Sequence, residues 1–86
     1  MRINVTRRNI DEGQRGSCRR DPICLAMLDA GLLCPWVSPS SITWLDRGFV
    51  KKSVETPENV LQFMKEYDAD DHWSVFPFEF ELEDVV

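Results

Sequence analysis

The last part of the chain alternates strictly between large apolar and polar side chains. The apolar positions are Phe76, Phe78, Phe80 and Leu82, and they alternate with Pro77, Glu79, Glu81 and Glu83. Successive side chains of a β-strand point to opposite faces, so this period of two predicts a strand with an aromatic face on the core and a carboxylate face in water. Pro77 cannot donate a hydrogen bond to a neighbouring strand. We therefore expect an edge strand, or one whose pairing begins only after Pro77.

Two other segments begin with the signature of a helix start. Asp21-Pro22 and Thr56-Pro57 each place a capping side chain before a proline, and proline suits the first helical turn because its missing N–H needs no partner there. Apolar residues follow both pairs at helical spacing. These patterns predict two short helices, at about residues 22–30 and 57–67. A further turn or two of helix is expected between Thr6 and Gly13.

The remaining segments favour short strands. Ile3 and Val5 alternate with polar residues, and residues 42–54 show a period of two around the turn 46–48, where Gly48 is available for a positive φ. We therefore predict a β-hairpin there. Eighty-six residues suffice for one domain. The predicted fold is a single α+β domain, residues 1–86, with a small, mostly antiparallel sheet packed against two short helices.

The cysteines and the N-terminus indicate a soluble protein of a reducing compartment. Three cysteines are too few for a secreted disulfide scaffold. The first residues lack the apolar run of a signal peptide, and every uncharged apolar stretch is far shorter than the ~18 residues that a membrane span needs. We expect a cytoplasmic protein that does not enter a membrane.

The residues able to carry metal or catalytic chemistry are few and poorly spaced. Zinc sites use ligand pairs about two to four residues apart, whereas five, nine and thirty-seven residues separate Cys18, Cys24, Cys34 and His72. Any nucleophile, Cys18 included, would depend on the lone His72 as its base. The acidic loop at 68–72 lacks the glycine and the bidentate glutamate of a calcium loop. We expect no enzyme, no metal site and no cofactor.

Charge is distributed unevenly along the chain. Residues 1–20 carry six arginines against two carboxylates, whereas residues 21–86 carry thirteen carboxylates against four basic side chains, for a net charge of −5. The acidic part could present carboxylates to a basic groove on a protein partner. The candidate residues are Glu79, Glu81, Glu83, Asp84, Asp70 and Asp71.

The basic part supports an alternative function, nucleic-acid binding through an arginine cluster. Its members are Arg7, Arg8, Arg15, Arg19 and Arg20. The acidic balance of the whole chain, with a pI near 4.7, speaks against this alternative because nucleic-acid modules are usually basic. Internal pairing of the arginines with the acidic part is the competing interpretation.

Both ends of the chain resemble a known group of proteins. The matching residues are Val5-Thr6, Ile10, Gly13, Arg15-Gly16-Ser17-Cys18, Pro22-Ile23 and Leu25-Ala26, then Phe63, Tyr67-Asp68, Val75 and Pro77-Phe78-Glu79-Phe80-Glu81-Leu82. With this pattern the chain resembles small uncharacterised proteins of phages and bacterial mobile elements, many of which carry a cysteine where Asp21 stands here. The resemblance implies a non-enzymatic accessory protein that binds a host or phage protein, for example as an inhibitor of a host defence or nucleic-acid-processing complex.

Overall fold

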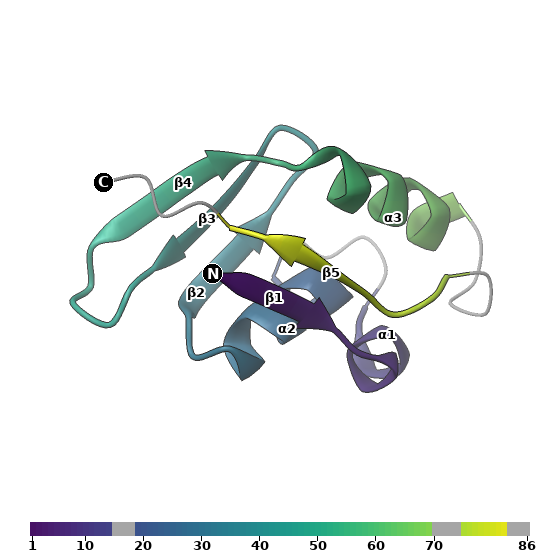
Figure 1. The fold of residues 1–86 in the computed structure, drawn as a ribbon, viewed down its shortest axis with the longest axis horizontal. Coiled ribbons are helices and arrows are strands. Elements are labelled where there is room, and N and C mark those ends of the chain that lie inside the picture. The colour runs from purple at the N-terminus through teal and green to yellow at the C-terminus, as the bar shows by residue number, and fades with distance from the viewer. Residues whose placement is uncertain (15–18, 70–74, 83–86) are drawn as a thin grey trace.

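The computed structural model of the chain describes residues 1–14, 19–69 and 75–82. In chain order its elements are β1 (Arg2–Val5), α1 (Arg7–Glu12), α2 (Pro22–Asp29), β2 (Leu33–Val37), β3 (Ser41–Leu45), β4 (Lys51–Glu55), α3 (Glu58–Ala69) and β5 (Phe78–Glu81). The described residues thus form three helices and antiparallel strands, which confirms the predicted small α+β domain (Figure 1). The two longer helices lie within two residues of the predicted ranges.

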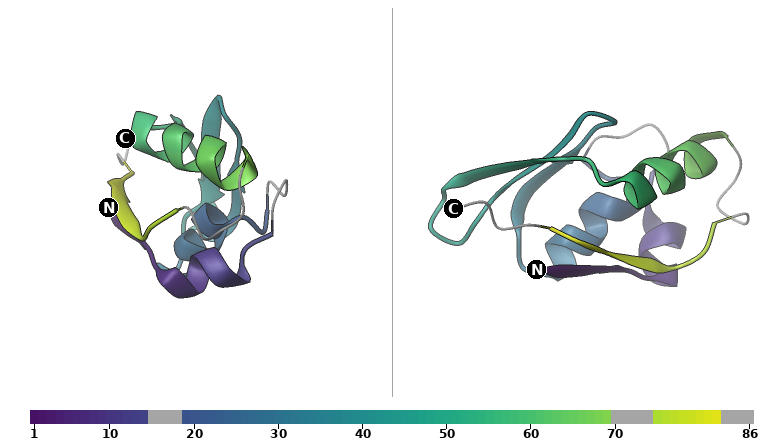
Figure 2. Two further views of the ribbon diagram at one scale, coloured as in Figure 1. Left: turned by 90° about the vertical axis from the view of Figure 1, so that its right-hand side faces the viewer. Right: turned by 45° about the horizontal axis from the view of Figure 1, so that its top comes forward.

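The described strands form two antiparallel sheets rather than one. β1 pairs with β5, so the two ends of the chain lie side by side, while β2, β3 and β4 form a three-stranded meander. Helix α2 contacts both β1 and β2 and lies between the sheets (Figure 2). Because α2 is covered from two sides, it is buried at Pro22, Ile23, Cys24, Ala26 and Met27 rather than along one stripe.

The terminal sheet confirms the alternating pattern of the last strand from Phe78 onward. Phe80 and Leu82 are buried in the core, and Glu79 and Glu81 are exposed on the opposite face. The prediction for Phe76 was wrong, because its ring is 74% exposed. The strand begins only at Phe78, directly after Pro77, so the period of two does not extend back to position 76.

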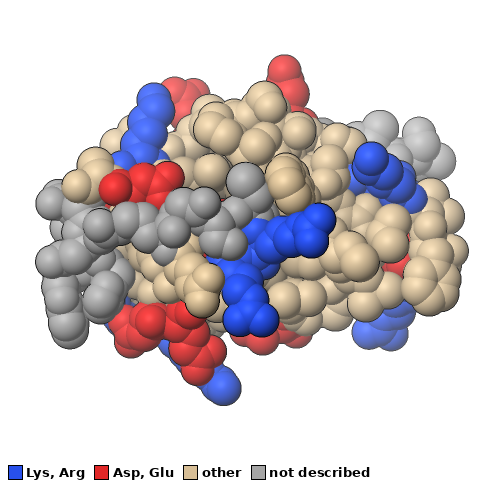
Figure 3. All heavy atoms as spheres, turned by 180° about the vertical axis from the view of Figure 1, so that it is seen from behind, with Lys and Arg blue, Asp and Glu red and all other residues tan. Residues whose placement is uncertain are grey.

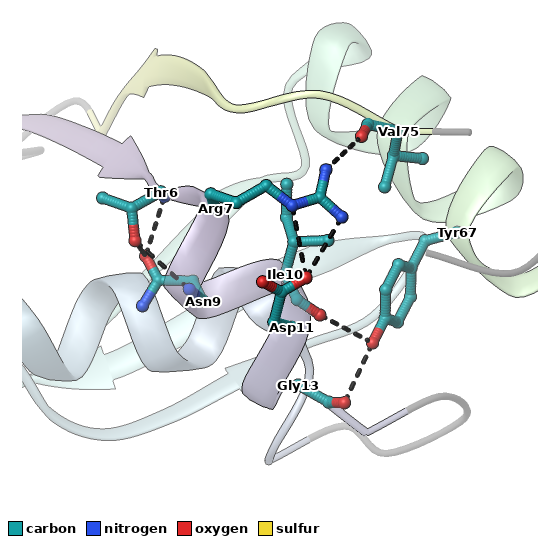
Figure 4. Close-up of polar contacts among 8 residues, drawn as sticks. All are labelled: Thr6, Arg7, Asn9, Ile10, Asp11, Gly13, Tyr67 and Val75. Carbon is teal, nitrogen blue, oxygen red and sulfur yellow. Dashed lines mark hydrogen bonds and ion pairs between the residues drawn. The ribbon is translucent and has the colours of Figure 1, made fainter. Parts of the chain in front are cut away.

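Helix α1 is held at its start by its own residues and at its end by α3. Thr6 Oγ1 accepts a hydrogen bond from Asn9 N (3.2 Å), and Thr6 N donates to Asn9 Oδ1 (2.9 Å), which together make a capping box. At the other end Tyr67 Oη donates to Gly13 O (2.9 Å) and lies 3.4 Å from Ile10 O (Figure 4). The tyrosine therefore satisfies carbonyl groups that the end of a helix leaves without a donor.

Gly13 ends α1 as predicted, but for a different reason. Its φ is −67°, a value that any residue adopts, so the left-handed conformation is not what selects glycine here. A Cβ at this position would lie 2.7 Å from Pro22 Cδ, well inside contact distance. Glycine is needed because the end of α1 and the start of α2 approach each other too closely for a side chain.

The hairpin of β3 and β4 was predicted correctly, except for the conformation of its turn. Ile42 and Trp44 are buried, as their alternation indicated. The residue with a positive φ is Phe49 (62°), rather than Gly48, which was expected to adopt it. The left-handed position of the turn is therefore one residue later in the chain than the sequence suggested.

Candidate functional site

The predicted acidic surface is described in part and contains an arginine. Glu79 and Glu81 lie on the outer face of the β1–β5 sheet, where Arg2 stands opposite Glu81. Arg2 Nε lies 3.2 Å from Glu81 Oε1 and 3.8 Å from Glu79 Oε2. All three side chains are more than half exposed, so these ion pairs are each worth at most about 1 kcal/mol and a basic partner could displace Arg2. The other predicted members, Glu83, Asp84, Asp70 and Asp71, lie outside the described residues.

The described members of the predicted arginine cluster lie on two segments, α1 and the turn before α2. On α1, Arg7 pairs with Asp11 (Nη2 to Oδ1, 3.1 Å) and Arg8 pairs with Glu12 (Nε to Oε1, 3.1 Å). These are pairs four residues apart on one helix face, which stabilise a helix modestly. Both partners, Asp11 and Glu12, belong to the basic part of the chain, so these two pairs are not the expected pairing with the acidic part.

Arg19 and Arg20, which follow α1 in the chain, lie in the turn before α2. The guanidinium of Arg19 lies over the ring of Trp36, an outward residue of β2, 5.3 Å from its centroid. Arg20 is exposed in the turn before α2, where its carbonyl accepts a hydrogen bond from Gln14 N (2.8 Å), and Arg15 lies outside the described residues. Basic and acidic side chains are interspersed on the face of Figure 3 rather than separated by sign.

The segment Phe76-Pro77-Phe78 forms an exposed aromatic surface, here called the aromatic ridge. Phe76 and Pro77 are exposed, while Phe78 is half-buried with its ring 4.8 Å from that of Phe63 on α3. Sequence reasoning missed this surface by placing Phe76 in the core. Pro77 was the available signal, because it marks where the sheet starts and leaves the preceding ring outside.

Two shallow hollows flank the aromatic ridge in the described part of the chain. One, of about 290 Å³, is lined by the ridge and by Asn59, Gln62, Phe63 and Glu66 of α3. The other, of about 470 Å³, is lined by Asn4, Val5, Thr6, Arg7 and Glu79 together with Pro77 and Phe78. The ridge thus lies between two shallow hollows, both of which are lined in part by Pro77 and Phe78.

Hydrogen bonds hold the ridge and its rim in place. Arg7 Nη1 donates to Val75 O (3.0 Å), directly before the ridge (Figure 4), and Asn59 Nδ2 donates to Glu79 O (3.2 Å), directly after Phe78. Gln62 Nε2 donates to Glu66 Oε1 (3.0 Å) and so orients that carboxylate at the rim. The arrangement offers an aromatic contact surface bordered by Glu66 on one side and by Glu79 and Arg7 on the other, and the Glu66 side suits an apolar side chain with a cation beside it.

Asp21 is the described carboxylate with the most perturbed environment. It caps α2 by accepting a hydrogen bond from Cys24 N at Oδ1 (2.8 Å). Burial raises the pKa of Asp21 from 3.8 to about 6, and the charge of Asp68 acts in the same direction. A perturbed carboxyl can mark a catalytic site, but the residues lining the two hollows do not include Asp21. We interpret it as a helix cap whose ionisation opposes folding.

Metal and nucleophile candidates do not gather in the described part of the chain. Cys24 is buried in α2 and Cys34 is exposed on β2. Residues 1–14, 19–69 and 75–82 contain no group of three or more His, Cys, Asp or Glu side chains placed to hold a metal ion. Cys18 and His72, on which the enzyme alternative depended, lie outside these ranges. In the same ranges no helix has the length and apolar character to cross a membrane.

No family model, no curated protein and no solved structure matches this chain. The resemblance to small phage and mobile-element proteins therefore stays a prediction from the sequence.

Proposed function

We propose that this chain is a non-enzymatic accessory protein that binds a basic segment of a protein partner through the aromatic ridge. The observation that carries the proposal is Phe76, a large ring left 74% exposed on a segment tied down at both ends. Burying such a ring gains about 1.5–3 kcal/mol. Aromatic residues, Phe included, are enriched at protein interfaces, where a few anchoring side chains carry most of the binding energy.

The chemistry around the ridge supports a basic partner. Among the described residues, Glu66 is the only charged side chain that lines one hollow, so a partner could insert an apolar side chain beside Phe76 and place lysine or arginine on that rim. The other hollow is lined by Glu79 and by Arg7, which is paired with Asp11. The net charge of −5 would also accelerate the approach of a basic surface. In this proposal Glu79 still contacts the partner, as the sequence suggested. The centre of the interface is the aromatic ridge instead of the carboxylates of the last strand.

The sequence resemblance supplies the setting of the proposal. We infer a phage or mobile-element protein that acts in the host cytoplasm. Complexes that process nucleic acid, defence complexes among them, carry basic surfaces for their substrate. An acidic protein seated on such a surface would exclude the nucleic acid and so inhibit the complex.

Affinity capture from host lysate followed by titration of the purified partner tests the proposal. Wild type is compared with Phe76→Ser, which removes the ring, and with the matched control Leu28→Ser, which removes a 47% exposed apolar side chain from α2. We expect Phe76→Ser to lose the partner and Leu28→Ser to retain it. Equal recovery by wild type and Phe76→Ser would contradict the proposal.

The charge component has its own test. The double variant Glu66→Gln/Glu79→Gln keeps the size of both side chains and removes both charges from the rim. We expect weaker binding and a shallower dependence of affinity on salt. An unchanged salt dependence would exclude these carboxylates from the interface.

A further inference from the structure

The turn between β3 and β4 carries a second exposed aromatic residue, far from the aromatic ridge. The turn and the first residue of β4, together residues 46–51, are here called the hairpin tip. It lies at one end of the 36 Å long axis, and the ridge lies toward the other end (Figure 1). Phe49 is 75% and Val50 54% exposed. The two surfaces are therefore independent of each other.

Backbone hydrogen bonds define the conformation of the hairpin tip. Asp46 O accepts from Phe49 N (2.9 Å), and Asp46 N donates to Val50 O (3.0 Å). Asp46 Oδ1 accepts from both Gly48 N (2.9 Å) and Val50 N (3.0 Å). In a three-residue hairpin loop of this kind, the last loop residue takes the left-handed conformation and is usually glycine.

Phe49 occupies that left-handed position with a φ of 62°. A residue with a Cβ is disfavoured there by about 1–2 kcal/mol, and Gly48, which could adopt it freely, stands one position earlier. The chain thus tolerates local strain at a position where the side chain stays 75% exposed. Strained residues of this kind cluster at functional positions, where the surrounding structure holds them.

Several basic residues lie near Phe49 in the sequence. Between residues 46 and 52 the chain carries Arg47, Lys51 and Lys52 against Asp46, a local charge of +2 in a molecule of net charge −5. Arg47 and Lys51 are exposed. The guanidinium of Arg47 reaches Gly31, with Nη2 3.2 Å from where a Cβ on that residue would stand. Gly31 has a φ of 89°, a conformation that favours glycine.

The charge at the hairpin tip indicates its ligand. A local charge of +2 in an acidic chain favours a polyanion over the basic protein surface that suits the aromatic ridge. A single ring is enough to stack on one base, which contributes about 1–3 kcal/mol, and adjacent cations can meet the flanking phosphates. We propose that the hairpin tip binds single-stranded nucleic acid, with Phe49 stacked on a base and Arg47 and Lys51 on the backbone phosphates.

Fluorescence anisotropy with a short labelled oligothymidylate tests the proposal. Phe49→Gly removes the ring and suits the left-handed conformation, so it keeps the fold and is expected to weaken binding about 5- to 150-fold. Arg47→Gln/Lys51→Gln should lower the slope of log affinity against log salt by about 1.4, since each phosphate contact on a single strand contributes about 0.7. The control Phe76→Ser should bind as wild type, which separates this inference from the proposed function.

Several results would overturn the inference. Absence of saturable binding at low salt would do so, as would equal affinities of wild type and Phe49→Gly. Binding to vesicles of anionic lipid without binding to the oligonucleotide would assign the hairpin tip to a membrane surface instead. If Phe49→Gly lost the protein partner but not the oligonucleotide, the tip would belong to the protein interface.

Discussion

Replacement of Asp21 by asparagine should change how stability depends on pH. Burial raises the pKa of Asp21 from 3.8 in the unfolded chain to about 6 in the folded protein, so folding favours the protonated carboxyl. The contribution of the protonated Asp21 to the free energy of unfolding is complete below the pKa of the unfolded chain, and it is lost as pH rises through about 6. A difference of about two pKa units corresponds to a loss of about 3 kcal/mol. Asparagine caps a helix about as well as aspartate and does not ionise.

Urea unfolding followed by tryptophan fluorescence measures this effect, since Trp44 is buried. Wild type and Asp21→Asn should have similar free energies of unfolding at about pH 4, and the variant should be more stable by up to about 3 kcal/mol at pH 7. Taking the difference between the two proteins cancels the titration of every other carboxylate. Asp21→Ala, which also loses the cap, should lie about 1 kcal/mol below Asp21→Asn. A difference that is independent of pH, or that grows toward low pH, would refute the reasoning.

Three further substitutions test the packing and the turn. Gly13→Ala should lower the free energy of unfolding by about 1–3 kcal/mol, because the new methyl group overlaps Pro22; an unchanged urea midpoint would contradict the close approach of α1 and α2. Tyr67→Phe should cost about 1 kcal/mol, since Gly13 O loses its donor while the ring is kept, and a cost near zero would mean that water replaces the hydroxyl. Phe49→Gly should raise the free energy of unfolding by about 1 kcal/mol, because it relieves the left-handed strain; a lower urea midpoint would show that the ring stabilises the turn.

The features that the sequence predicted well are those that short segments decide by themselves. Asp21-Pro22 starts a helix because the cap and the proline act within one turn, and Asp21 does accept the hydrogen bond from Cys24 N. The alternation at Phe80 and Leu82 has the same local origin. The division into two sheets could not be predicted, because an alternating pattern shows that a strand exists but does not identify its partner.

The candidate sites depended on register and on distant contacts, so they were harder to predict. The pairing of Arg7 with Asp11 could have been read from a spacing of four residues on a helix. The pairing of Arg2 with Glu81 requires the two chain ends to meet in one sheet. At the hairpin tip, the hydrogen bonds of Asp46 shift the left-handed position by one residue, from the expected Gly48 to Phe49.

The affinity of the purified partner for wild type and for Phe76→Ser is the measurement that most directly tests the account. If the aromatic ridge is the centre of the interface, loss of its exposed ring should cost at least about 2 kcal/mol, a weakening of about 30-fold or more. The control Leu28→Ser should bind within about twofold of wild type, as expected for an apolar side chain outside the interface. A Phe76→Ser variant that folds normally and binds as tightly as wild type would contradict the account.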